Sequence, residues 1–179
     1  MKTCLLIIDM INTFDFPEAD RLFPAIIHAA ERIAHLKQRA VTAGVPVIYL
    51  NDNFGKWRHD FGALVTQCLK GPCSGQPVAR LLRPNEQDYF VLKPKHSGFY
   101  ATPLELLLRL LGVGRLVLTG VAGDNCVQYT AADAYMREFT LSVPPDCVVS
   151  LDDEANAQAL QQMGMNLKAD LQPSEKIVF

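Results

Sequence analysis

The sequence lacks a long apolar run, a paired-cysteine motif and an excess of charge of either sign. None of its apolar stretches is long enough to cross a bilayer, and no small-residue cleavage site follows the N-terminal segment. We therefore expect neither a membrane partner nor a signal peptide. Seventeen basic and nineteen acidic side chains leave a net charge of -2, which gives no general attraction for nucleic acid. These absences favour a small-molecule partner.

The cysteines follow no disulfide or zinc pattern. Their number is odd, and no pair stands in a CxxC spacing. This usage is typical of reduced thiols, so we expect a cytoplasmic protein. The five are Cys4, Cys68, Cys73, Cys126 and Cys147.

Size and composition indicate one globular domain. The 179 residues are 49% hydrophobic and 20% charged, which is enough for a substantial core. The chain shows no internal repeat and no low-complexity linker. We therefore expect a single domain over residues 1–179.

Strand and helix signals alternate along the chain. This alternation predicts an α/β fold with a doubly wound, mostly parallel sheet and helices on both faces, because parallel strands need crossover connections. The run at 4–8 is continuously apolar and predicts a central strand. Residues 51–83 predict a short helix, loops and one further helical turn. The other strands are predicted at 45–50, 88–93, 115–119, 140–143, 147–149 and 175–179, and the helices at 26–38, 102–112, 126–136 and 152–164.

The helix at 102–112 carries start and stop signals. Thr102 is expected to cap it, with Pro103 at its first position and Glu105 completing a capping box. Gly112 is the expected stop.

The stretch 115–136 reads as a buried strand, a glycine-containing turn and a helix that begins at Cys126. Unpaired amide groups at a helix start stabilise a thiolate and can bind an oxyanion. A reactive cysteine is therefore plausible here. The alternative is that Cys126 is a small core residue.

Three reactive side chains fall where predicted strands end: Asp9, Lys93 and Cys126. In an open α/β sheet, ligands gather beyond the carboxyl ends of the strands. We therefore expect these side chains to converge on one site. Each also has a plain structural alternative, as a turn cap, a solvated lysine and core filler respectively.

Four segments resemble the isochorismatase-like cysteine hydrolases, a family that includes nicotinamidases and other small-amide hydrolases. They are LLIIDMINTF, NDNFGKWRHDF, VLKPKHSGFYATPLELLLRLLGV and LVLTGVAGDNCVQYTAADA, in family order. The resemblance implies an Asp9, Lys93 and Cys126 triad and an oxyanion hole formed by the N–H groups of Ala122 and Cys126. It also implies a cis peptide between Val121 and Ala122, and a homo-oligomer, as a dimer or tetramer.

These residues have complementary expected roles. Lys93 and the helix start are expected to favour the Cys126 thiolate, and Asp9 to accept the thiol proton and deliver it to a leaving amine. Lys95 competes with Lys93 by proximity, but Lys93 directly follows the strand and matches the family motif. Substrate contacts are expected from Phe14, Asn53, Trp57, Tyr100 and Tyr129, for which ordinary packing is the alternative.

The segment after the second strand departs from the nicotinamidase pattern. That branch carries an Asp-x-His metal motif, whereas here Asp52 is followed by Asn53 and Phe54. Asp52 with His59 would give too few ligands for zinc. We therefore predict no catalytic metal and no cofactor.

Three function classes follow from these observations. The first is a metal-independent hydrolase of a small-molecule amide or related acyl C–N bond, acting through a Cys126 thioester. The second is isochorismatase-type hydrolysis of a vinyl ether, which does not need the cysteine. The third is a non-enzymatic binding or assembly module on the same fold.

Overall fold

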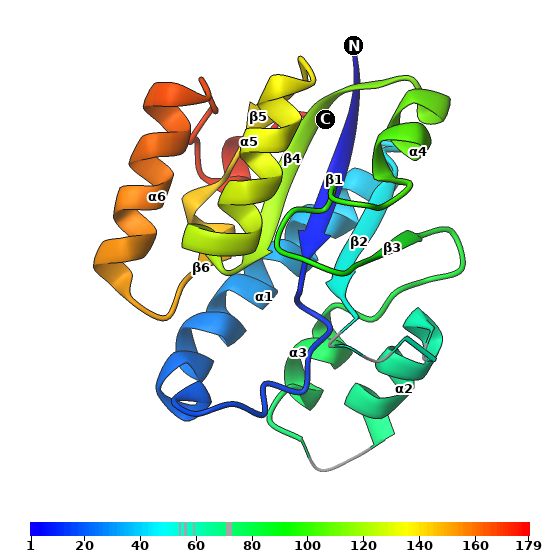
Figure 1. Cartoon of the computed structure of the whole chain (residues 1–179), viewed down its shortest axis with the longest axis vertical. Coiled ribbons are helices and arrows are strands. Elements are labelled where there is room, and N and C mark those ends of the chain that lie inside the picture. Colours follow the sequence, from blue (N-terminus) through cyan, green and yellow to red (C-terminus); the bar gives the residue numbers. More distant parts are fainter. Residues whose placement is uncertain (54, 56, 59, 71–72) are drawn as a thin grey trace.

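The computed structural model describes residues 1–53, 55, 57–58, 60–70 and 73–179. Its centre is a parallel sheet in the order β3-β2-β1-β4-β5, with β6 also paired to β4. Figure 1 shows the carboxyl ends of β1, β2 and β4 at the edge nearest α2 and α3. The strands are β1 (Lys2–Ile8), β2 (Val47–Asp52), β3 (Tyr89–Lys93), β4 (Val113–Val121), β5 (Thr140–Ser142) and β6 (Val148–Val149).

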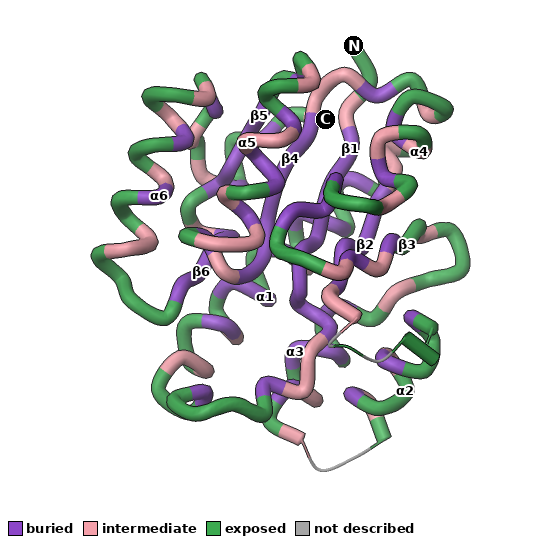
Figure 2. Tube along the Cα trace, viewed as in Figure 1, coloured by how far each residue is buried: buried purple, intermediate pink, exposed green. Residues whose placement is uncertain are grey.

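The central strand β1 is buried on both faces, as its unbroken apolar run predicts. Residues 4–8 are completely shielded from solvent, and Figure 2 shows the buried stretch continuing through the neighbouring strands. Alternate side chains enter different cores: Leu5 and Ile7 pack on one face, and Leu6 and Ile8 on the other. Burial on both faces explains why this strand shows no alternation of polar residues.

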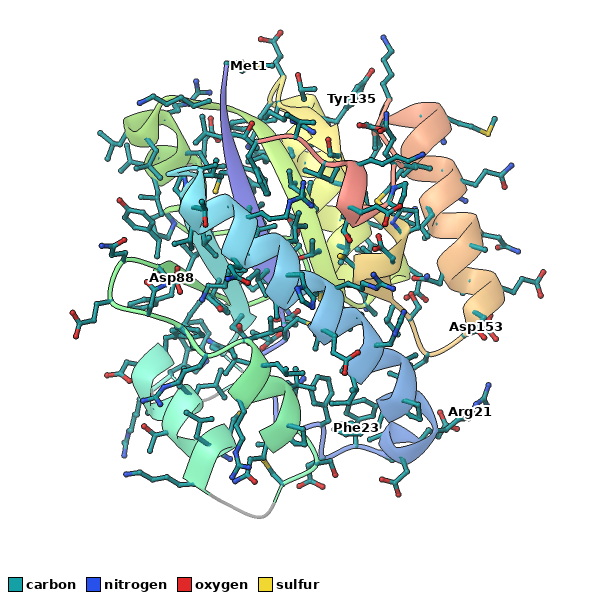
Figure 3. The ribbon with its side chains drawn as sticks, turned by 180° about the vertical axis from the view of Figure 1, so that it is seen from behind. Met1, Arg21, Phe23, Asp88, Tyr135 and Asp153 are labelled. Carbon is teal, nitrogen blue, oxygen red and sulfur yellow. The ribbon has the colours of Figure 1, made fainter. Side chains whose placement is uncertain are left out.

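Helices cover both faces of the sheet, which confirms the predicted doubly wound architecture. One core contains residues of α1, α2 and α3, and the other contains residues of α4, α5 and α6. Figure 3, drawn from behind, shows α1 crossing the rear face. The helices are α1 (Ala19–Thr42), α2 (Phe61–Lys70), α3 (Gln76–Leu81), α4 (Leu104–Leu111), α5 (Gln128–Met136) and α6 (Asp153–Asn166).

The start of α4 differs from its prediction. The helix begins at Leu104, whose N–H donates to Thr102 Oγ1 over 3.2 Å. The predicted capping box is wrong, because the Glu105 carboxylate instead accepts from Arg109 (2.7 Å) and from Arg137 of α5 (2.8 Å). A salt-bridge network between two helices thus outcompetes the local cap.

The predicted strand at 175–179 is also wrong. Ser174–Lys176 forms a 3₁₀ turn, and the rest of this tail adds no strand to the sheet. Its carbonyl groups are satisfied by guanidinium groups instead: Arg39 donates to Ser174 and Ile177, and Arg115 donates to Val178. These donors come from distant parts of the chain, so a local apolar pattern does not reveal them.

Within the part of the chain that the structure describes, no helix is both long enough and apolar enough to pass through a lipid bilayer.

The end of β4 depends on a glycine. Gly120 has a φ of 114°, and a Cβ placed on it would lie 2.0 Å from the carbonyl oxygen of Ile8. We expect Gly120→Ala to lower the free energy of unfolding by more than about 3 kcal/mol, because backbone strain adds to a clash with a buried strand. Urea unfolding followed by circular dichroism measures this loss.

Gly44→Ala is the matched control for this prediction. Gly44 has a φ of 68°, but a Cβ there would meet nothing within 4 Å. Its expected loss is therefore about 1 kcal/mol, from backbone strain alone. Equal losses in the two variants would show that the contact with Ile8 is unimportant.

Candidate active site

The strand order brings three strand ends to one edge of the sheet. Asp9 directly follows β1, Lys93 ends β3, and Cys126 lies in the turn after β4. The chain runs outward from β1 to β3 and then returns to β4 on the other side of β1, so β1 and β4 flank a topological switch point. β2 separates β1 from β3 by two strand spacings, about 10 Å in all. The long side chain of Lys93 bridges that separation.

Lys93 contacts both other members of the predicted trio. Its Nζ lies 2.7 Å from Asp9 Oδ2 and 3.4 Å from Cys126 Sγ. It also donates to the carbonyl oxygen of Lys95 over 3.3 Å. The Lys93 side chain is completely buried, whereas Lys95 is exposed. The lysine that reaches the cysteine is therefore the one at the strand end.

Asp52 orders the carboxylate of Asp9. Its backbone N–H donates to Asp9 Oδ1 over 2.6 Å, while Lys93 holds the other carboxylate oxygen. The carboxylate of Asp52 itself lies 3.9 Å from Lys93 Nζ. Both oxygens of Asp9 are thereby fixed in orientation.

The surroundings of Cys126 favour its protonated thiol. Burial raises its pKa to about 12, and the charge of Asp9 adds to this rise, while Lys93 opposes it. This differs from the prediction that Lys93 and the helix start favour the thiolate. Burial and the anionic neighbour outweigh the lysine.

Burial also raises the pKa of the Asp9 carboxyl, against the opposing effect of Lys93. Burial acts to lower the pKa of Lys93, but Asp9 and Cys126 outweigh it, so that pKa is raised as well. One buried cation thus faces two groups that can become anions, and it neutralises one of them. The arrangement favours a proton shared between Asp9 and Cys126.

The turn that carries Cys126 is a π-helical turn, Gly123–Val127, ahead of α5. This refines the prediction that α5 starts at the cysteine. The Val121–Ala122 peptide before the turn is cis. Within the turn the Val127 N–H donates to Ala122 O over 3.0 Å, and the Asp124 N–H donates to Ser150 Oγ over 3.0 Å.

Thr130 connects this turn to the segment after Lys93, and it was not among the site residues predicted from the sequence. Its buried hydroxyl accepts from the Gly98 N–H (3.0 Å) and donates to Cys126 O (2.6 Å). The two hydrogen bonds tie the segment beyond the lysine to the segment bearing the thiol. Its spacing of four residues after Cys126, on the same helical face, is the signal that would have found it.

The predicted pocket residues occupy different environments. Phe14 is 2% exposed and packs edge-on against Phe16 and Phe23, with ring centroids 6.3 Å apart in each pair. This places Phe14 in the hydrophobic core. Trp57 is 78% exposed. The backbone N–H of Asn53 donates to Lys93 O over 3.2 Å, which keeps Asn53 close to the end of β3.

Tyr129 stacks on a histidine that lies beside the thiol. Its ring stacks on His96, with centroids 5.6 Å apart and an interplanar angle of 29°. His96 Nδ1 lies 4.0 Å from Cys126 Sγ. Tyr100 is 59% exposed, and its N–H donates to Ser97 O over 3.2 Å. The structure thus brings Tyr129 to the neighbourhood of the cysteine, and it holds Tyr100 by a backbone hydrogen bond within its own loop.

The prediction of no catalytic metal concerns the segment after β2. Among the described residues, no group of three or more histidine, cysteine, aspartate or glutamate side chains could hold a metal ion. Phe54 and His59 lie outside the described residues. The absence of a metal stays a prediction from the sequence.

Comparisons with known proteins agree on one family. Residues 3–172 match the family model described as the isochorismatase domain. The isochorismatase family protein YaaI of Bacillus subtilis (strain 168) is 39% identical, over 97% of this chain and 95% of its own length. Ureidoacrylate amidohydrolase RutB of Methylorubrum extorquens is 30% identical, over 89% of this chain and 73% of its own length.

A solved structure gives the same result. The crystal structure of N-carbamoylsarcosine amidase from Thermoplasma acidophilum superposes with a TM-score of 0.77 at 28% identity. The superposition covers all of both chains.

The charge arrangement predicts opposite effects of two substitutions on the thiol. Asp9→Asn removes an anion that raises the Cys126 pKa, and Lys93→Met removes a cation that lowers it. Because the thiolate is the form that reacts, we expect Asp9→Asn to speed alkylation of Cys126 by iodoacetamide at pH 8 and Lys93→Met to slow it. Each pKa unit changes the thiolate fraction about tenfold, so the two rates should differ by at least that factor.

Peptide-resolved mass spectrometry over time measures these rates, and the rate at Cys73 in the same samples is the internal control. Slower alkylation in Asp9→Asn than in the wild type would contradict the charge arrangement.

Proposed function

Because the chain belongs to the isochorismatase domain family, we propose that it hydrolyses a C–N bond of a small-molecule amide, with Cys126 as the nucleophile. The single observation that carries this proposal is the buried Lys93 ammonium, 2.7 Å from the Asp9 carboxylate and 3.4 Å from the Cys126 thiol. The trio places a nucleophile, a base and a cation at one point, the arrangement that acyl transfer needs. The names of two relatives, an amidohydrolase and an amidase, support the choice of bond.

In the first step, Cys126 Sγ attacks the carbonyl carbon and passes its proton to Asp9. The raised pKa of the thiol makes proton removal during attack necessary, and the raised pKa of Asp9 improves it as the acceptor. The C–N bond then breaks, and Asp9 delivers the proton to the departing nitrogen. The products are a thioester on Cys126 and free ammonia or amine.

In the second step, water attacks the thioester carbonyl and gives a proton to Asp9. The C–S bond breaks, the acid product leaves, and Asp9 returns the proton to the sulfur. Lys93 keeps its proton throughout and holds a positive charge beside both groups, in line with its raised pKa.

In this proposal the backbone N–H groups of Ala122 and Cys126 donate hydrogen bonds to the oxyanion of each tetrahedral intermediate. Ala122 precedes the π-helical turn and Cys126 lies within it. Backbone donors fixed before the reaction stabilise developing charge without reorganising. The anchoring of this turn through Ser150 supports that role.

Ureas that carry the carbamoyl group are the first substrates to assay. Ureidoacrylate and N-carbamoylsarcosine, named for two relatives, both contain an H₂N–CO–N unit. Attack on its carbonyl would release ammonia in the first step. Ammonia release is therefore a common readout for a panel of ureas, carbamates and primary amides.

The thioester is the feature that separates this proposal from vinyl-ether hydrolysis. We expect Cys126→Ala to lose at least about a thousandfold in kcat while keeping the wild-type circular dichroism spectrum. Rapid acid quench of the wild type should give a protein mass increased by the acyl group on the Cys126 peptide. Cys73→Ala is the matched control and should keep both turnover and the adduct. Undiminished turnover in Cys126→Ala would rule out the nucleophile.

The pH dependence should follow the shared proton. Activity requires ionised Asp9, whose pKa is raised above its ordinary 3.8, so kcat/KM should fall as pH drops through a value above 3.8. The pKa of Cys126 is about 12 and that of Lys93 is raised, so deprotonation of these groups should cause no loss up to about pH 10. A profile of kcat/KM from pH 4 to pH 10 measures both limbs. A decline starting near pH 8 would contradict the assigned protonation states.

A further inference from the structure

The N–H donors of the Lys93 ammonium already have acceptors within the protein. An ammonium group has three N–H donors, and Lys93 Nζ has Asp9 Oδ2, Cys126 Sγ and Lys95 O within 3.4 Å. Its side chain is completely buried. A polar group on the substrate therefore needs a different donor near the sulfur.

His96 lies beside the sulfur of Cys126. Its Nδ1 is 4.0 Å from Sγ, and the residue is exposed, whereas Lys93 and Asp9 are buried. An acyl carbon is one covalent bond from Sγ, so the atoms that follow it come within contact distance of the imidazole. This distance puts the imidazole within reach of the part of a substrate that stays attached after the first step.

The orientation of His96 is supported from two sides. Tyr129 of α5 stacks on the ring at 5.6 Å. The next residues, Ser97 and Gly98, are buried, and the Gly98 N–H donates to Thr130 Oγ1. The imidazole is therefore presented on a fixed segment beside the sulfur and backed by an aromatic face.

We propose that His96 determines substrate specificity by donating a hydrogen bond to a carboxylate on the acyl portion of the substrate. The inference rests on the proposed function and narrows its substrate class to small N-carbamoyl or amide compounds that also bear a carboxylate. An imidazole has a ring N–H donor in either protonation state. Asp9 and Asp52 both lie near Lys93, so a carboxylate close to this cluster needs a compensating donor.

The test compares two substrates that differ in one group. N-carbamoylsarcosine carries the carboxylate, and 1-ethyl-1-methylurea replaces it with a methyl group. We expect His96→Ala to reduce kcat/KM for ammonia release from the acid by roughly 10- to 100-fold, mainly through KM, and to change the rate for the uncharged urea by less than about threefold. His96→Gln retains a donor and should recover part of the loss.

Two further variants separate recognition from folding. Tyr129→Ala removes the stacked ring and Tyr129→Phe keeps it, so the loss on the acid should be larger in the alanine variant. His35→Ala changes an exposed histidine of α1 and serves as the control for histidine removal. An equal loss on both substrates in His96→Ala, or no loss on either, would overturn the proposal.

A binding measurement distinguishes this inference from the proposed function. In the Cys126→Ala protein, where the compound is not consumed, N-carbamoylsarcosine should protect His96 from diethylpyrocarbonate and leave His35 unprotected, as read by mass spectrometry. Equal modification of His96 with and without the compound would overturn the role of His96. Absence of ammonia release by the wild type, with protection intact, would count against the proposed hydrolysis and leave the recognition by His96 supported.

Discussion

The buried ammonium of Lys93 is the interaction on which the rest of the site depends. Removing a charged group from water costs several kcal/mol unless opposite charges and acceptors surround it. Asp9, Cys126 and the carbonyl oxygen of Lys95 supply these partners. They come from separate segments of the chain, so the charge is compensated when the strand ends meet. The strand order that forms the fold is therefore also what surrounds the Lys93 charge with its partners.

Much of the fold could be predicted because strands in a parallel sheet are marked by short apolar runs in the sequence. The apolar run of β1 and the strand ending at Lys93 are local patterns with a direct physical cause. The same reasoning predicted that Asp9, Lys93 and Cys126 lie together, as they do, since a strand end in a parallel sheet has a defined place. The tail beyond Ser174 and the cap at Glu105 were mispredicted, because arginine side chains from distant elements decide both.

The protonation state of the site could not be predicted from the order of residues. A lysine and a helix start both argue for a thiolate, and each effect is real. Their sum depends on how deeply Cys126 is buried and how near Asp9 lies, which are three-dimensional quantities. Thr130 was missed for a related reason. Its two hydrogen bonds join segments that are about thirty residues apart, and a threonine within a helix does not by itself indicate such a link.

The bridge made by Thr130 has a consequence for how such a scaffold can diversify. It joins the turn bearing the sulfur to the segment beyond β3, while the connection between β2 and α2 carries Trp57, which is 78% exposed. Exposed loop positions such as Trp57 can therefore change while the hydrogen bonds of Thr130 stay the same. A single reactive framework could in this way serve a succession of unrelated metabolites.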